Sequence, residues 1–428
     1  MLRNIDSDLN NWSNQINRKP LIIIGARQVG KSYTVRQLGQ TEFNGDFVEI
    51  NFEKRADLHL VFEQNLDIKR IIAELSIALD HTIIPGQTLL FFDEIQACPK
   101  ALMCLRYFYE DLPALHVIAA GSLLEFQLKN ISFPVGRVEM KYMYPLTFLE
   151  YLDAIGQSRI TTAIKDRSNT ALGEVVENIV YQHLNEYFIV GGLPEAVNHF
   201  VHHHDYAKVT QIQDDLLYLY KQDYKKYTPM VNAECLQDIM DQVALNIGNQ
   251  IIYTKLSDRY TIPKIKQGVE VLRTAQLLYK VNNVSARALP LATQGKQFKL
   301  LYLDIGLLVR MSKIDLKEAI IKKNLYATYQ GMLAEQFVGQ QLLTKHHDQL
   351  YYWSRIAPNS TAEVDYIIIE NGNIIPIEVK SGAKGALRSL HVFLTENPHV
   401  KQAKIYARVK HGVDEKYEFL PLYMAGVD

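Results

Sequence analysis

An octapeptide near the N-terminus has the residues and the spacing of a phosphate-binding loop. Residues 25–32 read GARQVGKS and match the pattern G-x-x-x-x-G-K-[ST] in full. The octapeptide follows an apolar run, residues 21–24, and precedes a helical stretch, which is the context that the motif requires. Gly25 and Gly30 let the backbone curl so that successive N–H groups converge on phosphate oxygens. The helix that follows adds its positive N-terminal end.

The side chains of this loop have separate expected roles. We expect Lys31 to reach the β- and γ-phosphates and the hydroxyl of Ser32 to hold Mg²⁺, whereas the side chain of Arg27 is expected to face solvent. The residues expected to surround the nucleotide are Gly25, Ala26, Arg27, Gln28, Val29, Gly30, Lys31, Ser32 and Tyr33. A glycine-rich turn with a surface lysine is the alternative interpretation.

Two carboxylates end a second apolar run, TLLFFDEIQ at residues 88–96. An acidic residue where a buried strand emerges beside a phosphate loop can complete the Mg²⁺ coordination shell, and this is the expected role of Asp93. Glu94 would polarise the attacking water, because general-base catalysis needs a carboxylate within hydrogen-bond reach of that water. The alternative is that the two acids merely end a strand.

Ser122 ends another apolar run, residues 115–122. A small polar side chain at the end of a strand next to the phosphate loop is a candidate sensor of the γ-phosphate. An ordinary serine between a strand and a loop is the competing interpretation.

A third group of charged residues lies near the C-terminus. Asp365 lies in an apolar run at residues 362–370, and Glu378-Val-Lys380 ends the next run, after an Asn-Gly turn that predicts an antiparallel hairpin. Alternation along a strand puts Glu378 and Lys380 on one face, which can lie beside Asp365. This is the PD-(D/E)xK nuclease pattern, in which two carboxylates bind Mg²⁺ and the lysine helps activate water. Glu335, on a preceding helical stretch, matches an extra upstream acid and is a further candidate metal ligand.

The fold and the activity of this C-terminal region are separate predictions. Two strands with these residues can keep a nuclease-like fold without cutting anything, the acid and base forming only an ion pair. The usual proline is out of register, since Pro358 lies seven residues before Asp365. Basic residues that would suit a nucleic acid follow the motif, namely Lys384, Arg388, Lys401, Lys404, Arg408 and Lys410.

The segment between residues 251 and 299 is locally basic in a chain that is nearly neutral. It holds two acids and nine bases, at positions 255, 259, 264, 266, 273, 280, 287, 296 and 299. Its pattern predicts a helix, a turn, a second helix and a strand, as in a winged helix-turn-helix with residues 261–275 as recognition helix. Lys264, Lys266 and Arg273 would then face phosphates or a groove. A spacer between domains with a solvated surface is the alternative.

The elements around these motifs change in type along the chain. Strand-length apolar runs at residues 20–28, 45–53, 88–96 and 115–122 alternate with helical patterns, which predicts a parallel sheet covered on both faces. Residues 145–245 are mainly helical by the recurrence of apolar residues three and four apart. The last hundred residues return to mixed helix and strand.

Composition sets wider limits on the protein. The 428 residues include 46 Lys and Arg against 47 Asp and Glu, and 48% are hydrophobic, which is typical of a globular chain of two to four domains. No apolar run approaches the 18–20 residues of a membrane span, and the polar start is unlike a secretory signal, so a cytoplasmic location is expected. Cys98, Cys104 and Cys235 fit neither a disulfide framework nor a zinc site.

The N-terminal third resembles AAA-type P-loop ATPases over residues 20–150. The stretches DEIQACPKALMCLRYFYED, HVIAAGSLLEF and VGRVEMKYMYPLTFLEYL resemble a widespread prokaryotic family of such ATPases with an uncharacterised C-terminal region. The resemblance extends over essentially the whole chain and implies ATP as the nucleotide. It also makes Arg137 a candidate charge sensor or arginine finger, since arginine stays protonated and forks onto phosphate oxygens. A structural ion pair is the alternative role of Arg137.

These observations predict an α/β protein of four domains. They are an AAA-type P-loop ATPase with a parallel sheet (1–155), a helical lid or linker (156–245), a winged helix (246–315) and a restriction-endonuclease-like α/β domain (316–428). The expected function is binding and hydrolysis of ATP with Mg²⁺, coupled to DNA binding by the winged helix and to the nuclease-like domain. The sequence is compatible with oligomerisation and does not fix the number of subunits. The alternative is a nucleotide-gated docking protein whose C-terminal domain binds nucleic acid or a protein without cleaving.

Overall fold

A computed structural model describes residues 1–122, 136–166, 172–224, 231–313, 325–357, 360–382 and 387–427, with the backbone alone at residues 325–330. Pro358 and Lys384 lie outside these residues. The chain divides into two compact units, Met1–Pro145 and Leu146–Asp428, which are described separately. The three later domains predicted from the sequence thus fall within one compact unit, and its boundary precedes the predicted one at residue 155.

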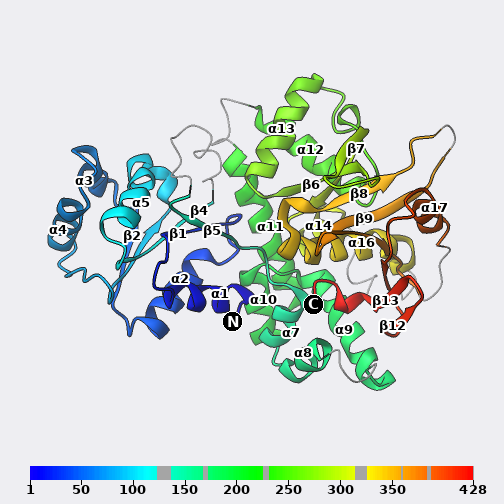
Figure 1. Ribbon diagram of the computed structural model, residues 1–428, viewed down its shortest axis with the longest axis horizontal. Helices are drawn as coiled ribbons and strands as arrows, with labels where there is room; N and C mark the ends of the chain where they lie inside the picture. The colour runs from blue at the N-terminus through cyan, green and yellow to red at the C-terminus, as the bar shows by residue number, and fades with distance from the viewer. Residues whose placement is uncertain are drawn as a thin grey trace. The chain divides into compact units, whose positions relative to one another are not determined.

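The N-terminal unit is built on a five-stranded, wholly parallel sheet in the order β2-β3-β4-β1-β5 (Figure 1). The strands are β1 (Leu21–Ile24), β2 (Phe47–Asn51), β3 (Leu89–Asp93), β4 (His116–Gly121) and β5 (Glu139–Tyr142). Every residue of β1, β3 and β4 is buried, which explains why these strands read as continuous apolar runs. The predicted parallel sheet is confirmed.

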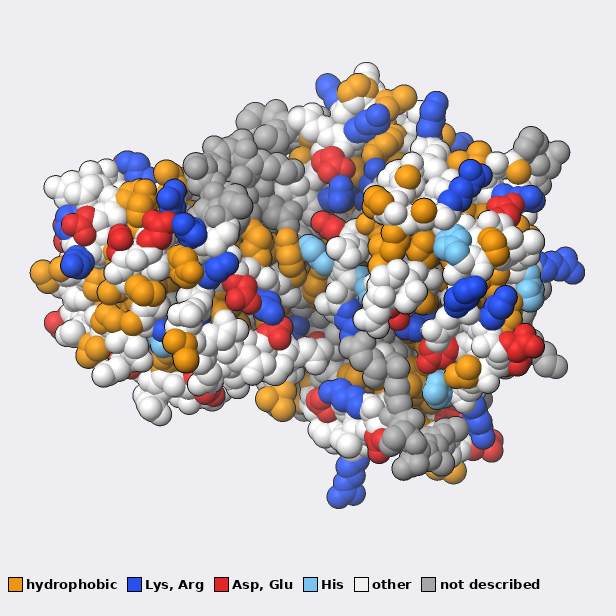
Figure 2. Space-filling view, in the orientation of Figure 1, with side chains coloured by type: hydrophobic (Ala, Val, Ile, Leu, Met, Phe, Trp, Pro, Cys, Tyr) orange, Lys and Arg blue, Asp and Glu red, His pale blue; other side chains and the backbone are white. Residues whose placement is uncertain are grey.

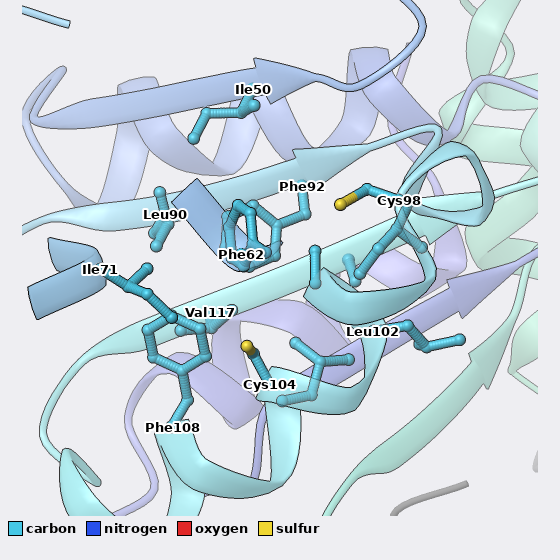
Figure 3. Close-up of a cluster of buried hydrophobic side chains, with 14 of the residues drawn as sticks. Ile50, Phe62, Ile71, Leu90, Phe92, Cys98, Leu102, Cys104, Phe108 and Val117 are labelled. Atoms are coloured by element: carbon cyan, nitrogen blue, oxygen red, sulfur yellow. The ribbon is translucent and has the colours of Figure 1, made fainter. Parts of the chain in front are cut away.

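Helices connect these strands and cover the sheet. They are α1 (Asn4–Ser13), α2 (Lys31–Glu42), η1 (Ala56–Leu58), α3 (His59–Glu63), α4 (Ile68–Ala78), η2 (Ile95–Ala97) and α5 (Pro99–Asp111). One core cluster packs the phenyl rings of Phe62, Phe92 and Phe108 together with the thiols of Cys98 and Cys104 (Figure 3). All three cysteines of the chain are free and buried, so they serve as small apolar side chains.

The C-terminal unit begins with helices and has further helices between and after its strands. Its helices are α7 (Phe148–Ala154), α8 (Ser158–Lys165), α9 (Glu174–Val190), α10 (Pro194–His203), α11 (Tyr206–Asp223), α12 (Ala233–Leu245), η4 (Tyr253–Lys255), α13 (Ile262–Thr274), α14 (Ile305–Met311), α16 (Leu325–His346), η5 (His347–Gln349), α17 (Arg388–Glu396) and η6 (Leu422–Met424). The break between α9 and α10 is held by Asp304, whose carboxylate accepts from the main-chain N–H of Gly192 at 2.7 Å. Gly191 adopts φ +73 there, a conformation that favours glycine.

An eight-stranded mixed sheet forms the rest of this unit, in the order β12-β13-β11-β10-β9-β8-β6-β7. The strands are β6 (Leu278–Ser285), β7 (Ala292–Tyr302), β8 (Tyr351–Ser354), β9 (Glu363–Glu370), β10 (Asn373–Val379), β11 (Ala403–Ala407), β12 (Gly412–Asp414) and β13 (Tyr417–Pro421). The hairpin predicted around the Asn371-Gly372 turn is confirmed, since β9 and β10 pair antiparallel and both turn residues have positive φ.

One sheet joins the two regions that the sequence assigned to a winged helix and to a nuclease-like domain. Helices α12 and α13 pack on each other and are followed by the β6–β7 hairpin. Helix α12 nevertheless ends before residue 246, and the first helix expected from residue 251 onward is only the short η4 (Tyr253–Lys255). However, β6 also pairs with β8 at residues 282 and 283. The hairpin therefore extends the sheet that carries Asp365 and Glu378. Within the described residues, no helix is both long and apolar enough to cross a membrane.

Candidate nucleotide site and C-terminal carboxylate cluster

The predicted phosphate loop connects β1 to α2 with the tight geometry that its glycines allow. Gly30 has φ +100 and Gln28 has φ +66, so the chain reverses direction just before the first helical residue, Lys31. A Cβ atom on Gly25 would lie 2.4 Å from the carbonyl oxygen of Met143. Only glycine therefore fits at Gly25, and only glycine adopts the Gly30 conformation without strain. The side chains of Ala26 and Val29 are fully buried, whereas that of Tyr33 is exposed.

The ammonium group of Lys31 lies at this loop. Its Nζ donates to the carbonyl oxygens of Gly25 at 2.7 Å and of Ala26 at 2.8 Å. Burial lowers the pKa of Lys31 to about 8, against the opposing effect of the negative charges of Glu94 and Asp93. A buried cation beside curled main-chain amides is an arrangement suited to the oxygens of a polyphosphate.

Ser32 and Asp93 meet at the carboxyl edge of the sheet. The Ser32 Oγ lies 3.0 Å and 3.1 Å from the two carboxylate oxygens of Asp93. Burial, followed by the nearby charge of Glu94, raises the pKa of Asp93. A hydroxyl and a carboxylate side by side are oxygen donors of the kind that Mg²⁺ takes at phosphate loops, so the residues present fit this ion.

Asn51 belongs to the same group, and sequence reasoning missed it. Its Nδ2 donates to Asp93 Oδ2 at 3.1 Å, because β2 pairs with β3 and places Asn51 opposite Asp93. The available signal was a polar residue near the end of the apolar run at residues 45–53, at the edge where the carboxylates of a parallel neighbour also emerge.

Glu94 follows Asp93 in the left-handed region of the backbone, with φ +49, a conformation that costs a non-glycine residue energy and occurs often at functional sites. Its main-chain N–H donates to Asp93 Oδ1 at 3.1 Å, and its side chain accepts from Gln96. The turn therefore directs two consecutive carboxylates at the same edge of the sheet.

Ser122 is at this edge too, but it is already hydrogen-bonded. It follows β4, which lies between β1 and β3, and its Oγ accepts from Arg27 Nε at 3.1 Å. The Arg27 guanidinium also lies 3.6 Å from Glu53. The prediction that the Arg27 side chain faces solvent was wrong in this respect, because Ser122 and Glu53 hold it against the protein.

Arg137 does not join the other predicted residues of the nucleotide site. It precedes β5, which runs parallel to β1 with Leu21 opposite Glu139, so it lies at the amino edge of the sheet whereas the phosphate loop leaves the carboxyl edge. The length of β5, about 13 Å, separates the two edges. Arg137 Nε donates to Glu110 at 2.8 Å, which is the ion pair considered as its alternative role.

The acids predicted at the C-terminal hairpin come together around an unexpected partner. Carboxylate oxygens of Glu335, Glu363 and Asp365 lie within 4.8 Å of one another, on α16 and β9. The Nζ of Lys299, on β7, lies 2.6 Å from Glu335 and 3.8 Å from Asp365 and also pairs with Glu363. Glu363 and Lys299 thus belong to the cluster, although the sequence analysis gave Glu363 no role and counted Lys299 only as one of nine bases in the segment 251–299.

Electrostatics link these groups strongly. Burial by itself would lower the pKa of Lys299, but the charges of Glu335, Asp365 and Glu363 more than offset it, so this pKa is raised. Burial raises the pKa of Glu335 and of Asp365, and Lys299 opposes both shifts. The ammonium is therefore protonated and its charge is matched by surrounding carboxylates.

Glu378 and Lys380 lie beside this cluster as a separate pair. Lys380 Nζ donates to Glu378 Oε1 at 2.6 Å, while Glu378 Oε2 is buried without a hydrogen-bond partner in the described part of the chain. Burial is the main reason why the pKa of Glu378 rises to about 7. The main-chain N–H of Val379 donates to Asp365 at 2.7 Å. Asp365 therefore lies beside strand β10, as the sequence predicted.

The bases of the middle segment are mostly exposed, but acids pair with some of them. Lys264 and Lys266 are exposed on α13. Arg273 pairs with Glu270 at 2.9 Å, and Arg259 pairs with Asp238. Figure 2 shows several Lys and Arg side chains where Figure 1 places α13 and β7. The net positive charge of this surface is therefore smaller than the nine bases suggested.

The parallel sheet and its loop define the N-terminal unit as a P-loop NTPase. Residues 17–152 match the family described as AAA domain, which supports a P-loop ATPase in this part of the chain. Residues 181–318 and 330–422 match two families described as Domain of unknown function, DUF8612 and DUF4143.

Individual relatives are distant. An uncharacterised protein of Methanocaldococcus jannaschii is 26% identical over 273 residues, which are 64% of this chain and 49% of that protein. The chain thus spans about half the length of this curated relative. Among solved structures, the Walker-type ATPase of Pyrococcus abyssi has a TM-score of 0.46 at 15% identity, covering 72% of this chain and 94% of its own. PCH-2 of C. elegans has a TM-score of 0.24 at 12% identity, covering 42% and 53%.

Proposed function

We propose that the protein binds ATP with Mg²⁺ and hydrolyses it, and that the nucleotide controls DNA binding by the C-terminal unit. The observation that carries the first part is the contact between Ser32 and Asp93, which brings together the two oxygen donors expected to hold the metal. The second part rests on the helix–helix–hairpin order at α12, α13, β6 and β7 and on the exposed lysines of α13.

The roles of the side chains follow from their positions. Main-chain amides of residues 25–32 and the Lys31 ammonium bind the phosphates and orient the γ-phosphoryl group. Bound Mg²⁺, held by Ser32 and Asp93, would neutralise charge on the phosphate oxygens. Glu94 accepts a hydrogen bond from the attacking water and takes its proton as the oxygen bonds to phosphorus. The bond from phosphorus to the bridging oxygen breaks, giving ADP and phosphate.

Phosphate release measured with Mg²⁺ tests this proposal. We expect Lys31→Ala to lose nucleotide binding, and Glu94→Gln to keep binding but hydrolyse about 10²–10⁴-fold more slowly. Lys54→Ala, which removes an exposed lysine of the same unit, is the matched control and should keep the wild-type rate. Wild-type rates in both site variants would refute the assignment.

A second candidate function is that of a nucleotide-gated docking protein. In this case the C-terminal unit binds nucleic acid or a protein partner and cuts neither. The observation that favours it over cleavage is that the predicted nuclease acids already pair with lysines of the protein, Glu335 and Asp365 with Lys299 and Glu378 with Lys380. A nicking assay with Mg²⁺ or Mn²⁺ separates the two functions, because docking predicts intact DNA under conditions in which the protein still binds it.

Arg137 stays a candidate arginine finger only for the site of a neighbouring copy, since it lies at the edge of its own sheet opposite the phosphate loop. This role predicts an ATPase rate per chain that rises with protein concentration and falls to the dilute value in Arg137→Ala. A rate that is independent of concentration in the wild-type protein would contradict it.

A further inference from the structure

The acids predicted to bind Mg²⁺ in the C-terminal unit do not fit that role, because a cation of the protein itself lies among them. Among the described residues, Glu335, Glu363 and Asp365 are the group of three whose oxygens are close enough to share an ion. All three pair with the ammonium of Lys299. Glu378, the ligand expected from the motif, is absent from this group and pairs with Lys380 instead.

The ammonium and a divalent ion would compete for the same space. Mg²⁺ bonds to oxygens at about 2.0–2.1 Å. Because Glu335 Oε1 is 2.6 Å from the Lys299 Nζ, a Mg²⁺ bound to that oxygen would lie within about 4.7 Å of a positive charge. At that separation the two cations repel each other, and the carboxylate oxygens that bind the ammonium are less available to the ion.

Lys299 is also fixed in its position. Its side chain is 1% exposed, and its Nζ lies 5.3 Å from the ring centroid of Tyr352. The flanking residues Phe298 and Leu300 are buried, and Phe298 pairs with Ile251 across an isolated bridge. Moving the ammonium out of the cluster would leave three partly buried carboxylates close together without their counter-charge, which is costly.

We propose that Lys299 is the resident cation of this cluster and that its ammonium takes the place of a divalent metal ion. The cluster then ties β7, α16 and β9 together, and these acids support no metal-dependent chemistry. This inference does not depend on the ATPase activity, because it concerns the C-terminal unit alone.

Titration of the full-length protein with Mn²⁺ in the absence of nucleotide tests the proposal. Bound Mn²⁺ is counted by electron paramagnetic resonance. We expect the wild-type protein, Asp365→Asn and Glu335→Gln to bind equal amounts. Lys299→Met, of similar length but uncharged, should gain one additional site, and adding Asp365→Asn to it should remove that site. The phosphate loop is unchanged in all variants, so any contribution from it cancels.

Two results would overturn the proposal. One is Mn²⁺ binding by the wild-type protein that is lost in Asp365→Asn and in Glu335→Gln, since it would show that the metal and Lys299 coexist. The other is a folded Lys299→Met protein with no additional site. If Lys299→Met does not fold, the comparison of the wild-type protein with the two single acid variants still decides the question.

Discussion

The hydroxyl of Ser32 is hydrogen-bonded to both carboxylate oxygens of Asp93, at 3.0 Å and 3.1 Å. This contact joins the end of the phosphate loop to the end of β3 across β4. Asn51 supports it from the far side by donating to Asp93 Oδ2, so the carboxylate is oriented from two directions before any nucleotide arrives.

Removing the Asn51 amide should weaken Mg²⁺ binding without removing a metal ligand. Groups that orient a ligand typically contribute 10–100-fold to metal affinity, so we expect the Mg²⁺ concentration that half-saturates phosphate release by Asn51→Ala to rise by about this factor. Saturating Mg²⁺ should restore most of the rate. An unchanged half-saturation concentration would mean that Asn51 does not position Asp93.

Lys264 and Lys266 should contribute to DNA affinity through phosphate contacts. Each neutralised phosphate contributes about one to the slope of log affinity against log salt, so Lys264→Gln with Lys266→Gln should lower that slope by about two. Lys404→Gln is the control, because Lys404 is engaged with Glu370 at 2.7 Å and should leave the slope unchanged. Equal slopes for all three proteins would remove α13 from the DNA interface.

Gly191→Ala should destabilise the C-terminal unit. A Cβ atom on Gly191 would lie 2.2 Å from Asp304 Oδ1, and its φ of +73 strains any other residue. We expect a loss of about 1–3 kcal/mol from the backbone strain alone, measured by urea unfolding. Gly173→Ala, where a Cβ atom meets nothing within 4 Å, should cost much less. Equal unfolding midpoints for the two variants would contradict the close approach.

The N-terminal unit should become less stable as the pH is lowered, because of His116. Its ring is 7% exposed and bonds to Arg18 and to the carbonyl oxygen of Ser13. Burial, followed by the charge of Arg18, lowers the pKa of His116 from 6.5 to about 4. The unfolded chain therefore binds a proton between these values that the folded chain does not, and stability is lost as pH falls from about 6.5 towards 4.

This loss should reach about 3 kcal/mol at the acid end of the range. It is measured as the difference in unfolding free energy between the wild-type protein and His116→Gln at pH 7 and at pH 4.5. The wild-type protein should lose more stability than the variant. The same loss in both proteins would show that other groups cause the acid sensitivity.

The nucleotide site could be predicted from sequence because its main parts are local. The phosphate loop lies within eight consecutive residues, and Asp93 and Glu94 end a strand whose apolar character is plain. The position of Arg137 could not be predicted in the same way, because its distance from the loop depends on the direction and order of β5 and β1, which the residues around it do not encode.

The C-terminal cluster could be predicted only in part, because its residues come from distant parts of the sequence. The hairpin that carries Asp365 and Glu378 follows from alternation and an Asn-Gly turn, and it was predicted. The partner of the acids was not, because Lys299 lies 36 positions before Glu335 in a segment whose other bases are largely exposed. A single buried lysine in a basic stretch has no local signature, since only the completed fold brings β7 together with α16 and β9.

Strands β6 and β7 belong to the same sheet as β8 to β13. We therefore expect that the C-terminal unit cannot be divided between residues 315 and 316, where the motifs suggested a domain boundary. A recombinant fragment starting at residue 316 would lack the lysine that neutralises Glu335, Glu363 and Asp365, and it would leave the β8 backbone without its neighbour β6. Such a fragment should aggregate or misfold, and an active or inactive result obtained with it would say little about the intact chain.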